Sequence, residues 1–420
     1  MDSMVVTGGA VLSGEVDASG AKNSALILLF ATLLAEGEHI LHNVPDLKDV
    51  ESAAALLESL GSTVKRDGKT LRIKVAPPGS YEASYDLVRK MRASILCLGP
   101  LLTKYGKARV SLPGGCAIGT RPIDLHLEGM KALGAAIELK EGYVEAECKR
   151  LQGAEILFEF PTVGGTENLM MAAALAQGTT ILENAAKEPE IVDLANYLNK
   201  MGAKITGAGS SIIRIEGVDK LKPAEHTVIS DRIEVGTLLI AGAITGGEVT
   251  VKKCRPQDLD ALMSKMRDSG FNVTHTADSI TVHKNTGVWK GVDITTAPHP
   301  GFPTDLQAQF MALMTVAEGT SIISETVFEN RFMHVTELLR LNADITPKSR
   351  VAVVRGRPGK LQGAPVMATD LRASACLILA GLSAQGETRV NRIYHLDRGY
   401  ENLELKLQKL GAKVIRTTEF

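Results

Sequence analysis

At 420 residues the chain is longer than one ordinary hydrophobic core supports, and this length favours two or three domains. Apolar side chains make up 45% of the residues and aromatic ones only 4%, which indicates cores of alanine, leucine, isoleucine and valine. A formal net charge of −1 excludes the broad positive field typical of proteins that bind nucleic acids or acidic membranes.

The beginning of the chain argues against export and against membrane insertion. Residues 1–14 contain no basic segment that leads into an apolar run and a cleavage site. The apolar run from Ala25 to Ala35 is about half the roughly 20 residues that a membrane span requires, and it contains Thr32. We therefore expect a cytoplasmic protein with neither a membrane nor a nucleic-acid partner.

One pattern occurs six times along the chain, every 67 to 72 residues. In each copy an alanine-rich segment ends on a glycine, namely Gly37, Gly106, Gly178, Gly247, Gly319 and Gly386. Later in each copy a helical pattern stops at a second marker, namely Gly61, Gly134, Gly202, Gly270, Asn342 and Gly411. Because glycine, and next asparagine, best tolerates the left-handed conformation just past a helix end, both sets of markers are expected to follow helices.

The third copy shows the expected order of elements. It predicts a helix over 168–177, a strand over 179–183, a loop over 184–190, a helix over 191–201, and strands over 204–206 and 212–216. This unit is larger than the common solenoid repeats, so we expect a closed or globular α/β arrangement. Six copies divide naturally into two sets of three.

Charged residues gather at the helix starts and in the loops between strand and helix. In chain order these positions are Lys22, Lys48, Arg89, Lys90, Arg92, Arg121, Asp231, Arg232, Asp305, Glu329, Arg331, Asp370, Arg372, Asp397 and Arg398. The segment 160–167 also opens a helix, whose free N–H groups suit a phosphate. For any single charge, a solvated or capping role is the simpler interpretation. If the copies bring these loops to one cleft, however, its cations suit a small, multiply anionic substrate.

The five cysteines form no C-x-x-C pair and no cluster with histidine, which argues against a zinc site or a disulfide framework. Cys97 and Cys376 lie in apolar helical segments and are expected in the core. Cys116 lies in the loop 112–126, which contains three glycines and two prolines. An exposed thiol there, tuned by Arg121, could act as an acid, a base or a nucleophile. A glycine-rich turn with an incidental cysteine fits these features equally well.

Two common nucleotide motifs are missing from the sequence. It contains neither a P-loop nor a G-x-G-x-x-G after a strand, so neither ATP hydrolysis nor nicotinamide chemistry is indicated. No carboxylate cluster suggests a metal. We expect no cofactor and no metal site.

Six motifs, in order along the whole chain, carry a family resemblance. They are Ser-Gly-Ala-Lys-Asn at 19–23, Met-Arg-Ala-Ser at 91–94, Pro-Gly-Gly-Cys-Ala-Ile-Gly-Thr-Arg-Pro-Ile-Asp-Leu-His at 113–126, Glu-Asn-Arg-Phe at 329–332, Thr-Asp-Leu-Arg-Ala-Ser at 369–374 and Asp-Arg-Gly-Tyr at 397–400. Together they resemble the enolpyruvyl transferases that act on UDP-N-acetylglucosamine. The resemblance implies an inside-out α/β barrel in two domains, each with three βαβαββ units, and an active site between them. One domain would span residues 22–230, and the other would combine 1–21 with 231–420.

The resemblance also implies a reaction, the first committed step of bacterial peptidoglycan synthesis. An enolpyruvyl group passes from phosphoenolpyruvate to the 3-hydroxyl of UDP-N-acetylglucosamine by addition and elimination, and phosphate is released. The implied catalytic residues are Cys116 as general acid, Asp305 as base, Lys22 as the cation that stabilises the phosphate, and Arg398. A cysteine at position 116, where some relatives have aspartate, implies alkylation by the antibiotic fosfomycin.

The family's binding residues transfer to matching positions here. Phosphoenolpyruvate would contact Lys22, Asn23, Cys116, Arg121, Arg331, Arg372 and Arg398. UDP-N-acetylglucosamine would contact Arg92, Arg121, Pro122, Ile123, Asp124, Leu125, Thr162, Val163, Gly164, Asp305 and Val327. The sequence departs from some members at Phe160, where they have lysine, and at Gly165, where alanine is common. We expect modest changes in nucleotide affinity, and Phe160 could either stack on a ligand or pack against apolar neighbours.

Three other functions compete with this one. The sister enzyme that acts on shikimate 3-phosphate shares fold and donor, but its signature does not include the cysteine loop. A catalytically silent, sugar-nucleotide-binding regulator would not require the intact set of Cys116, Lys22, Asp305 and Arg398. An RNA-end-processing protein would require a net positive charge that this chain lacks.

Overall fold

The computed structural model describes residues 2–89, 91–112 and 123–418, and these form two compact units. We call residues 20–229 of this set the middle unit. The terminal unit combines residues 2–19 with residues 230–418, that is, both ends of the chain. Each unit has its own cluster of buried apolar side chains.

The described strands form six four-stranded sheets that share one topology. In each sheet a parallel pair is followed by two antiparallel neighbours. The middle unit contains β14 (Glu225–Thr227)–β3 (Gly37–His42)–β5 (Thr70–Val75)–β4 (Thr63–Asp67), β6 (Glu82–Ala83)–β7 (Lys107–Ser111)–β9 (Tyr143–Glu147)–β8 (Ala136–Lys140), and β10 (Glu155–Leu157)–β11 (Thr179–Glu183)–β13 (Ile212–Glu216)–β12 (Lys204–Thr206). The terminal unit contains β2 (Ser13–Asp17)–β15 (Glu248–Lys252)–β17 (Ser279–Val282)–β16 (Val273–His275), β18 (Ile294–Thr295)–β19 (Gly319–Ser324)–β21 (Val351–Gly356)–β20 (Asp344–Lys348), and β22 (Pro365–Met367)–β23 (Glu387–Asn391)–β1 (Asp2–Thr7)–β24 (Lys413–Thr418).

The first helix of each copy is buried almost all round. These helices are α1 (Lys22–Ala31), α4 (Leu98–Tyr105), α6 (Val163–Ala173), α8 (Arg232–Ile244), α10 (Gln307–Thr315) and α12 (Leu371–Ser383). A helix without a polar face has to be enclosed by other elements. In the terminal unit α8, α10 and α12 pack on one another, and in the middle unit α4 packs on α6.

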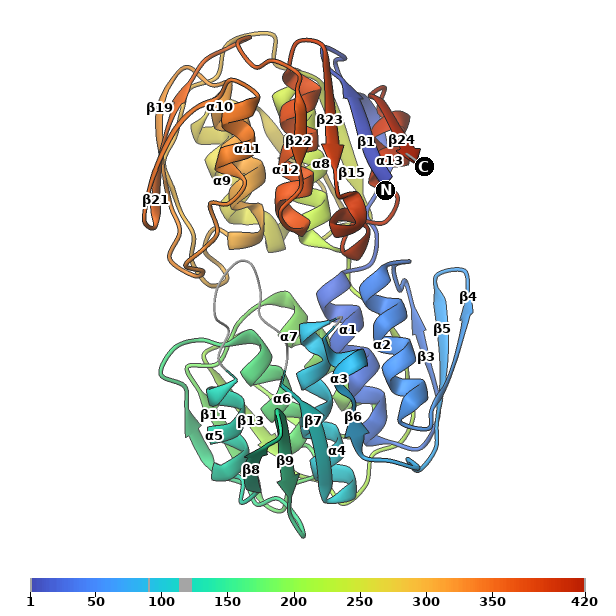
Figure 1. The fold of residues 1–420 in the computed structure, drawn as a ribbon. Helices are drawn as coiled ribbons and strands as arrows, with labels where there is room; N and C mark the ends of the chain where they lie inside the picture. Colours follow the sequence, from blue (N-terminus) through green and yellow to red (C-terminus); the bar gives the residue numbers. More distant parts are fainter. Residues whose placement is uncertain (1, 90, 113–122, 419–420) are drawn as a thin grey trace. The chain divides into compact units, whose positions relative to one another are not determined.

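The second helix of each copy carries a polar face. These helices are α2 (Lys48–Ser59), α5 (Asp124–Ala132), α7 (Pro189–Lys200), α9 (Asp260–Asp268), α11 (Val335–Arg340) and α13 (Leu403–Lys409). Short helical segments complete the chain: η1 (Thr32–Leu34), α3 (Tyr85–Val88), η2 (Arg92–Cys97), η3 (Pro256–Leu259), η4 (Thr304–Leu306) and η5 (Ile393–Arg398). Within each unit the first helices of the copies lie inside, and the strands lie outside them (Figure 1). The prediction of an α/β fold with six repeats is confirmed.

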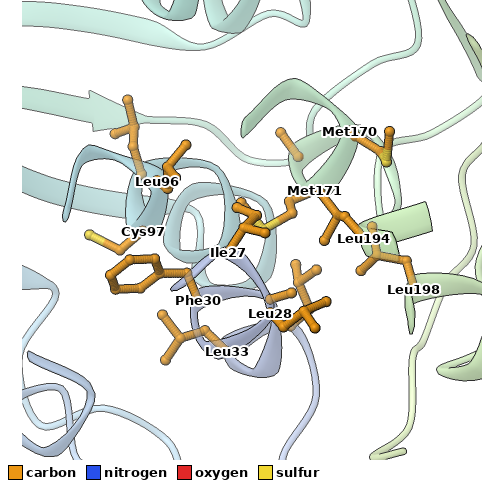
Figure 2. Packing of buried hydrophobic residues seen from close by; sticks show 14 of the residues in the cluster. Ile27, Leu28, Phe30, Leu33, Leu96, Cys97, Met170, Met171, Leu194 and Leu198 are labelled. Atoms are coloured by element: carbon orange, nitrogen blue, oxygen red, sulfur yellow. The ribbon is translucent and has the colours of Figure 1, made fainter. Parts of the chain in front are cut away.

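The close-up in Figure 2 shows how the core of the middle unit is filled. Ile27, Leu28 and Phe30 of α1 meet apolar side chains of η2, α6 and α7, and all of the labelled residues are buried. Cys97 belongs to this core, and burial raises the pKa of its thiol to about 12. Cys376 is buried in the core of the terminal unit. Both cysteines are therefore core residues, as predicted.

The glycine markers have the backbone conformation that the sequence predicts. All six second markers lie in the left-handed region, including Asn342 at φ 68°. Five of the six first markers do so as well, but in the fourth copy Gly246 takes this conformation, at φ 67°. The prediction for Gly247 was wrong by one residue. Gly247 is required for another reason, because a Cβ atom there would lie 1.9 Å from the carbonyl oxygen of Leu12.

In the third copy, the strands have the predicted bounds and the first helix does not. It spans Val163–Ala173 instead of 168–177, because the side chain of Thr162 accepts a hydrogen bond from the N–H of Gly165 and caps the helix earlier. Among the described residues, no helix is both long and apolar enough to cross a bilayer. Nor does that part of the chain bring three or more histidine, cysteine or acidic side chains into a metal-binding group.

Candidate active site

A carboxylate held between two arginines is the central feature of the terminal unit. Asp305 lies in η4, just before α10. Its Oδ1 accepts a hydrogen bond from Nη2 of Arg331 at 2.8 Å, and its Oδ2 accepts one from Nη2 of Arg372, also at 2.8 Å. The guanidinium side chains are only 4% and 5% exposed, whereas the Asp305 side chain is 26% exposed. The sequence-predicted residues Asp305, Arg331 and Arg372 thus meet in one cluster.

Both arginines of this cluster keep hydrogen-bond donors that the described residues do not use. The Nη1 atoms of Arg331 and Arg372 are buried and have no hydrogen-bond partner in the described part of the chain. The guanidinium groups lie 5.3 Å and 5.4 Å from the ring centres of Phe328 and Tyr400, whose aromatic faces stabilise a cation but accept no strong hydrogen bond. An anion bound here would supply further negative charge and the missing acceptors.

The two arginines also determine the protonation state of Asp305. Burial alone would raise the pKa of this carboxyl, but the charges of Arg372 and Arg331 outweigh burial and hold the pKa well below its usual range. Asp305 is therefore a firmly ionised carboxylate in this structure. It becomes a stronger base only if its contact with the arginines weakens.

A second buried carboxylate, Glu325, organises the backbone around this cluster. Glu325 follows β19 and accepts hydrogen bonds from the hydroxyls of Thr296 and Thr304, each at 2.8 Å. It also accepts hydrogen bonds from the N–H groups of Val327 and Phe328, at 2.8 and 3.1 Å. Glu325 thereby ties the residue before Asp305 to the segment that leads to Arg331.

A network of neutral polar side chains supports the other side of Asp305. The amide nitrogen of Gln309 donates to the carbonyl oxygen of Asp305 at 2.9 Å and to the hydroxyl of Tyr400 at 3.0 Å. Tyr400 also contacts the hydroxyl of Thr237 on α8. Burial raises the pKa of Tyr400, so its hydroxyl stays protonated near neutral pH. Arg398, two residues earlier, ends η5 and is partly exposed.

In the middle unit, Lys22 is held by an acidic residue from the next helix. Lys22 opens α1, and its Nζ lies 2.8 Å from Oδ2 of Asp49 in the first turn of α2. The two side chains are only 12% and 4% exposed. Asn23, the next residue, is exposed. The ammonium group of Lys22 therefore has a fixed position.

The predicted sugar-nucleotide residues of the middle unit lie at helix starts. Thr162, Val163 and Gly164 form the cap and first turn of α6, where backbone N–H groups lack partners within the helix. Asp124 opens α5 and is preceded by Ile123, with Leu125 in the first turn, whereas Arg92 opens η2. Phe160 is 51% exposed, so half of its surface is available to a ligand.

The predicted site residues are thus divided between the two units. Asp305, Val327, Arg331, Arg372 and Arg398 belong to the terminal unit, whereas Lys22, Asn23, Arg92, Ile123, Asp124, Leu125, Thr162, Val163 and Gly164 belong to the middle unit. Cys116, Arg121 and Pro122 lie outside the described residues. The sequence did not identify Asp49, Glu325 and His126 as site residues, although His126 ends the longest of the six motifs. Each of them has at least one partner more than 20 residues away along the chain, and only the fold reveals these contacts.

Comparison with known proteins agrees with the fold. The model of the EPSP synthase (3-phosphoshikimate 1-carboxyvinyltransferase) family matches residues 6–407. A UDP-N-acetylglucosamine 1-carboxyvinyltransferase of Bdellovibrio bacteriovorus is 69% identical over 98% of this chain and 100% of its own. One of Geotalea uraniireducens is 57% identical over the full length of both chains.

Among solved structures, the enolpyruvyl transferase NikO from Streptomyces tendae matches with a TM-score of 0.89 and 28% identity, covering 100% of this chain and 99% of its own. EPSP synthase from Acinetobacter baumannii shares the fold, with a TM-score of 0.77 and 16% identity over the full length of both chains. The chain belongs to the enolpyruvyl transferase family that the EPSP synthase model describes.

Proposed function

We propose that this protein transfers the enolpyruvyl group of phosphoenolpyruvate to the 3-hydroxyl of UDP-N-acetylglucosamine and releases phosphate. The reaction is a step of peptidoglycan synthesis and takes place in the cytoplasm. The name of the full-length relatives at 56–69% identity supports the acceptor and the type of transfer.

The observation that carries the proposal is the pair of buried arginines around Asp305. Phosphoenolpyruvate places a carboxylate and a phosphate on one small alkene. Buried guanidinium N–H groups without partners on Arg331 and Arg372 offer donors of the required type to such an anion. Lys22, Arg121 and Arg398 would supply the remaining positive charge.

The reaction consists of an addition followed by an elimination. The oxygen of the sugar 3-hydroxyl bonds to C2 of phosphoenolpyruvate, its proton goes to Asp305, and C3 takes a proton from the thiol of Cys116. The resulting tetrahedral ketal then loses phosphate, which leaves with the C2–O electron pair. The thiolate of Cys116 takes a proton back from C3, the alkene re-forms, and the proton held by Asp305 passes to the released phosphate. Lys22 stabilises the charge that grows on the phosphate.

The low pKa of Asp305 suggests how substrate binding activates the base. With both arginines on its oxygens, Asp305 is a weak proton acceptor. An anion that binds Arg331 and Arg372 competes for the same donors and adds a negative charge nearby. Both effects raise the pKa of the carboxyl, so the base becomes stronger when the donor substrate is present.

Phosphate release provides the direct test. We expect release from phosphoenolpyruvate to depend on UDP-N-acetylglucosamine, with no release when shikimate 3-phosphate is offered instead. Release with shikimate 3-phosphate alone would overturn the assignment of the acceptor. Binding of UDP-N-acetylglucosamine without any release would indicate a silent regulator.

The proposed role of Cys116 has its own prediction. Fosfomycin should alkylate this thiol and abolish turnover, and UDP-N-acetylglucosamine-dependent activity should vanish in proportion to the adduct measured by mass spectrometry. Cys116→Asp should keep activity and resist the antibiotic, because aspartate is an acid that the epoxide does not trap in the same way. Full activity after saturating treatment, with Cys116 unmodified, would contradict the role.

A further inference from the structure

A buried histidine next to the start of α6 has one ring nitrogen that the protein does not use. His126 lies on α5 and is only 7% exposed. A Cβ atom built on Gly164 would lie 3.2 Å from Cε1 and 3.3 Å from Nε2 of His126, so this edge of the ring faces the first turn of α6. The structure gives Nε2 no hydrogen-bond partner among the described residues, whereas Nδ1 contacts the amide nitrogen of Asn168 at 3.1 Å.

The surroundings of Asn168 fix the direction of that hydrogen bond. Its side-chain oxygen accepts from the N–H of Gly99 at 2.8 Å, a group that can only donate. Its amide nitrogen donates to the carbonyl oxygen of Ile95 at 3.1 Å, a group that can only accept. The amide therefore cannot be turned over, and its second N–H points to Nδ1 of His126. Nδ1 has to accept, so the ring proton resides on Nε2.

The same contact keeps the ring neutral. A proton on Nδ1 would face the N–H of Asn168, and burial lowers the pKa of His126 to about 4. The neutral ring thus directs one N–H donor to the place where α6, a helix of 11 residues, exposes its first backbone N–H groups.

We propose that Nε2–H of His126 donates a hydrogen bond to the diphosphate of the sugar nucleotide at the start of α6, and that Asn168 is the positioning residue that fixes this tautomer. The inference rests on the proposed function, because it assumes a sugar nucleotide as ligand. Gly164 fits the same arrangement, since a Cβ atom there would crowd the imidazole.

Direct binding measurements separate this inference from the proposed function. Titration calorimetry with UDP-N-acetylglucosamine, without phosphoenolpyruvate, reports binding independently of turnover. If the wild-type protein does not bind this ligand, the proposed function fails. If it binds, His126→Ala should weaken binding by about 10- to 100-fold, as expected for one hydrogen bond to a charged group, and His126→Gln should recover part of the loss.

The kinetic pattern should differ from that of a structural defect. His126→Ala should raise the KM for UDP-N-acetylglucosamine and leave the KM for phosphoenolpyruvate within about twofold. Unchanged affinity in a folded His126→Ala protein would overturn the proposal, and so would equal loss for both substrates with a lowered melting temperature. If His126→Ala does not fold, the affinity of His126→Gln for UDP-N-acetylglucosamine and the histidine ring spectra described below test the proposal instead.

Asn168→Asp tests the positioning role. An aspartate carboxylate can only accept a hydrogen bond, so it favours a proton on Nδ1 of His126. The His126 ring should then be charged at low pH, and at high pH it should be the neutral Nδ1–H tautomer. Affinity for the sugar nucleotide, flat from pH 6 to 8 in the wild type, should then fall as the pH rises. This dependence should vanish in Asn168→Asp combined with His126→Ala.

Long-range proton–nitrogen spectra of the histidine rings, assigned by comparison with His126→Gln, should show the Nε2–H tautomer in the wild type only. The Nδ1–H tautomer in the wild-type spectrum would disprove the proposal.

Discussion

The proposed anion site around Asp305 contains buried hydrogen-bond donors that have no partner in the described part of the chain. Two nearly buried guanidinium groups share one carboxylate, and each leaves a nitrogen unpaired. Buried charges without full compensation are costly. An anionic substrate would complete the arrangement, so part of the binding free energy comes from an imbalance that the folded chain already contains.

Removal of the carboxylate should separate binding from catalysis. Asp305→Asn leaves the two arginines without a competing anion, so phosphate should raise the melting temperature of the variant at least as much as that of the wild type. The loss of the base should lower kcat by about 10²- to 10⁴-fold. Asp344→Asn is the matched control, because Asp344 also contacts two arginines, Arg355 and Arg357, on the surface. Loss of phosphate binding together with kcat would contradict this account.

The same carboxylate predicts a dependence of stability on pH. Because the folded state holds the pKa of Asp305 well below its ordinary value, ionised Asp305 stabilises the fold above the unfolded-state pKa of about 4. This contribution disappears as the pH falls below about 4 towards the folded-state pKa. Urea unfolding at pH 6 and at pH 3.5 should show a difference between wild type and Asp305→Asn that shrinks at the lower pH. A difference that grows instead would mean that the carboxylate is not held ionised.

At the scale of helices and strands, the sequence predicted the ends of helices because these depend on the conformation of single residues. Many helices end on a left-handed residue, so the five glycines and Asn342 at the second markers correctly predicted where the second helix of each copy ends. The error at Gly247 arose because Gly246 and Gly247 are adjacent, and either could take the left-handed conformation. Gly246 takes it, and Gly247 packs closely against the backbone of Leu12.

The site was only partly predictable, because its supporting contacts are long-range. The chain separates Asp305 from Arg372 by 67 residues and His126 from Asn168 by 42. Motif resemblance identified the charged residues that would touch substrates. It gave no indication of Glu325 or Asn168, whose role is to hold other groups in place and which no local pattern distinguishes from ordinary polar residues.

At one marker glycine, the effect of the left-handed backbone conformation on stability can be measured without a change in side-chain packing. Gly411 follows the end of α13 and has φ 97°, and a Cβ atom there would meet nothing within 4 Å. Gly411→Ala should therefore lower the free energy of unfolding by about 1–2 kcal/mol through left-handed strain only. Gly79→Ala is the control, because its Cβ would also lie in open space and its φ is not positive. Equal effects of the two substitutions in chemical denaturation would show that the turn does not require glycine.

At the scale of the whole chain, the two crossings between the units that lie in the described residues, at 19–20 and 229–230, are anchored by polar groups inside a unit. In the terminal unit, Ser19 donates through its N–H to Glu234 at 2.7 Å, and Lys406 contacts both residues. In the middle unit, the N–H of Ala21 donates to the carbonyl oxygen of Ile229 at 2.7 Å. The two connections are thus bound to their own units, and the apolar cores remain separate.

Separate cores predict separate unfolding transitions, because domains with their own cores can unfold independently. Leu28 on α1 and Leu313 on α10 are both fully buried, one in each core. Either leucine changed to alanine should cost its own unit about 2–5 kcal/mol. In calorimetry, Leu28→Ala should lower one transition temperature and Leu313→Ala the other, and hydrogen exchange of the amides in α1 and α10 would assign each transition to its unit. A single transition whose temperature both variants lower by the same amount would show instead that the two cores unfold together, as one cooperative structure.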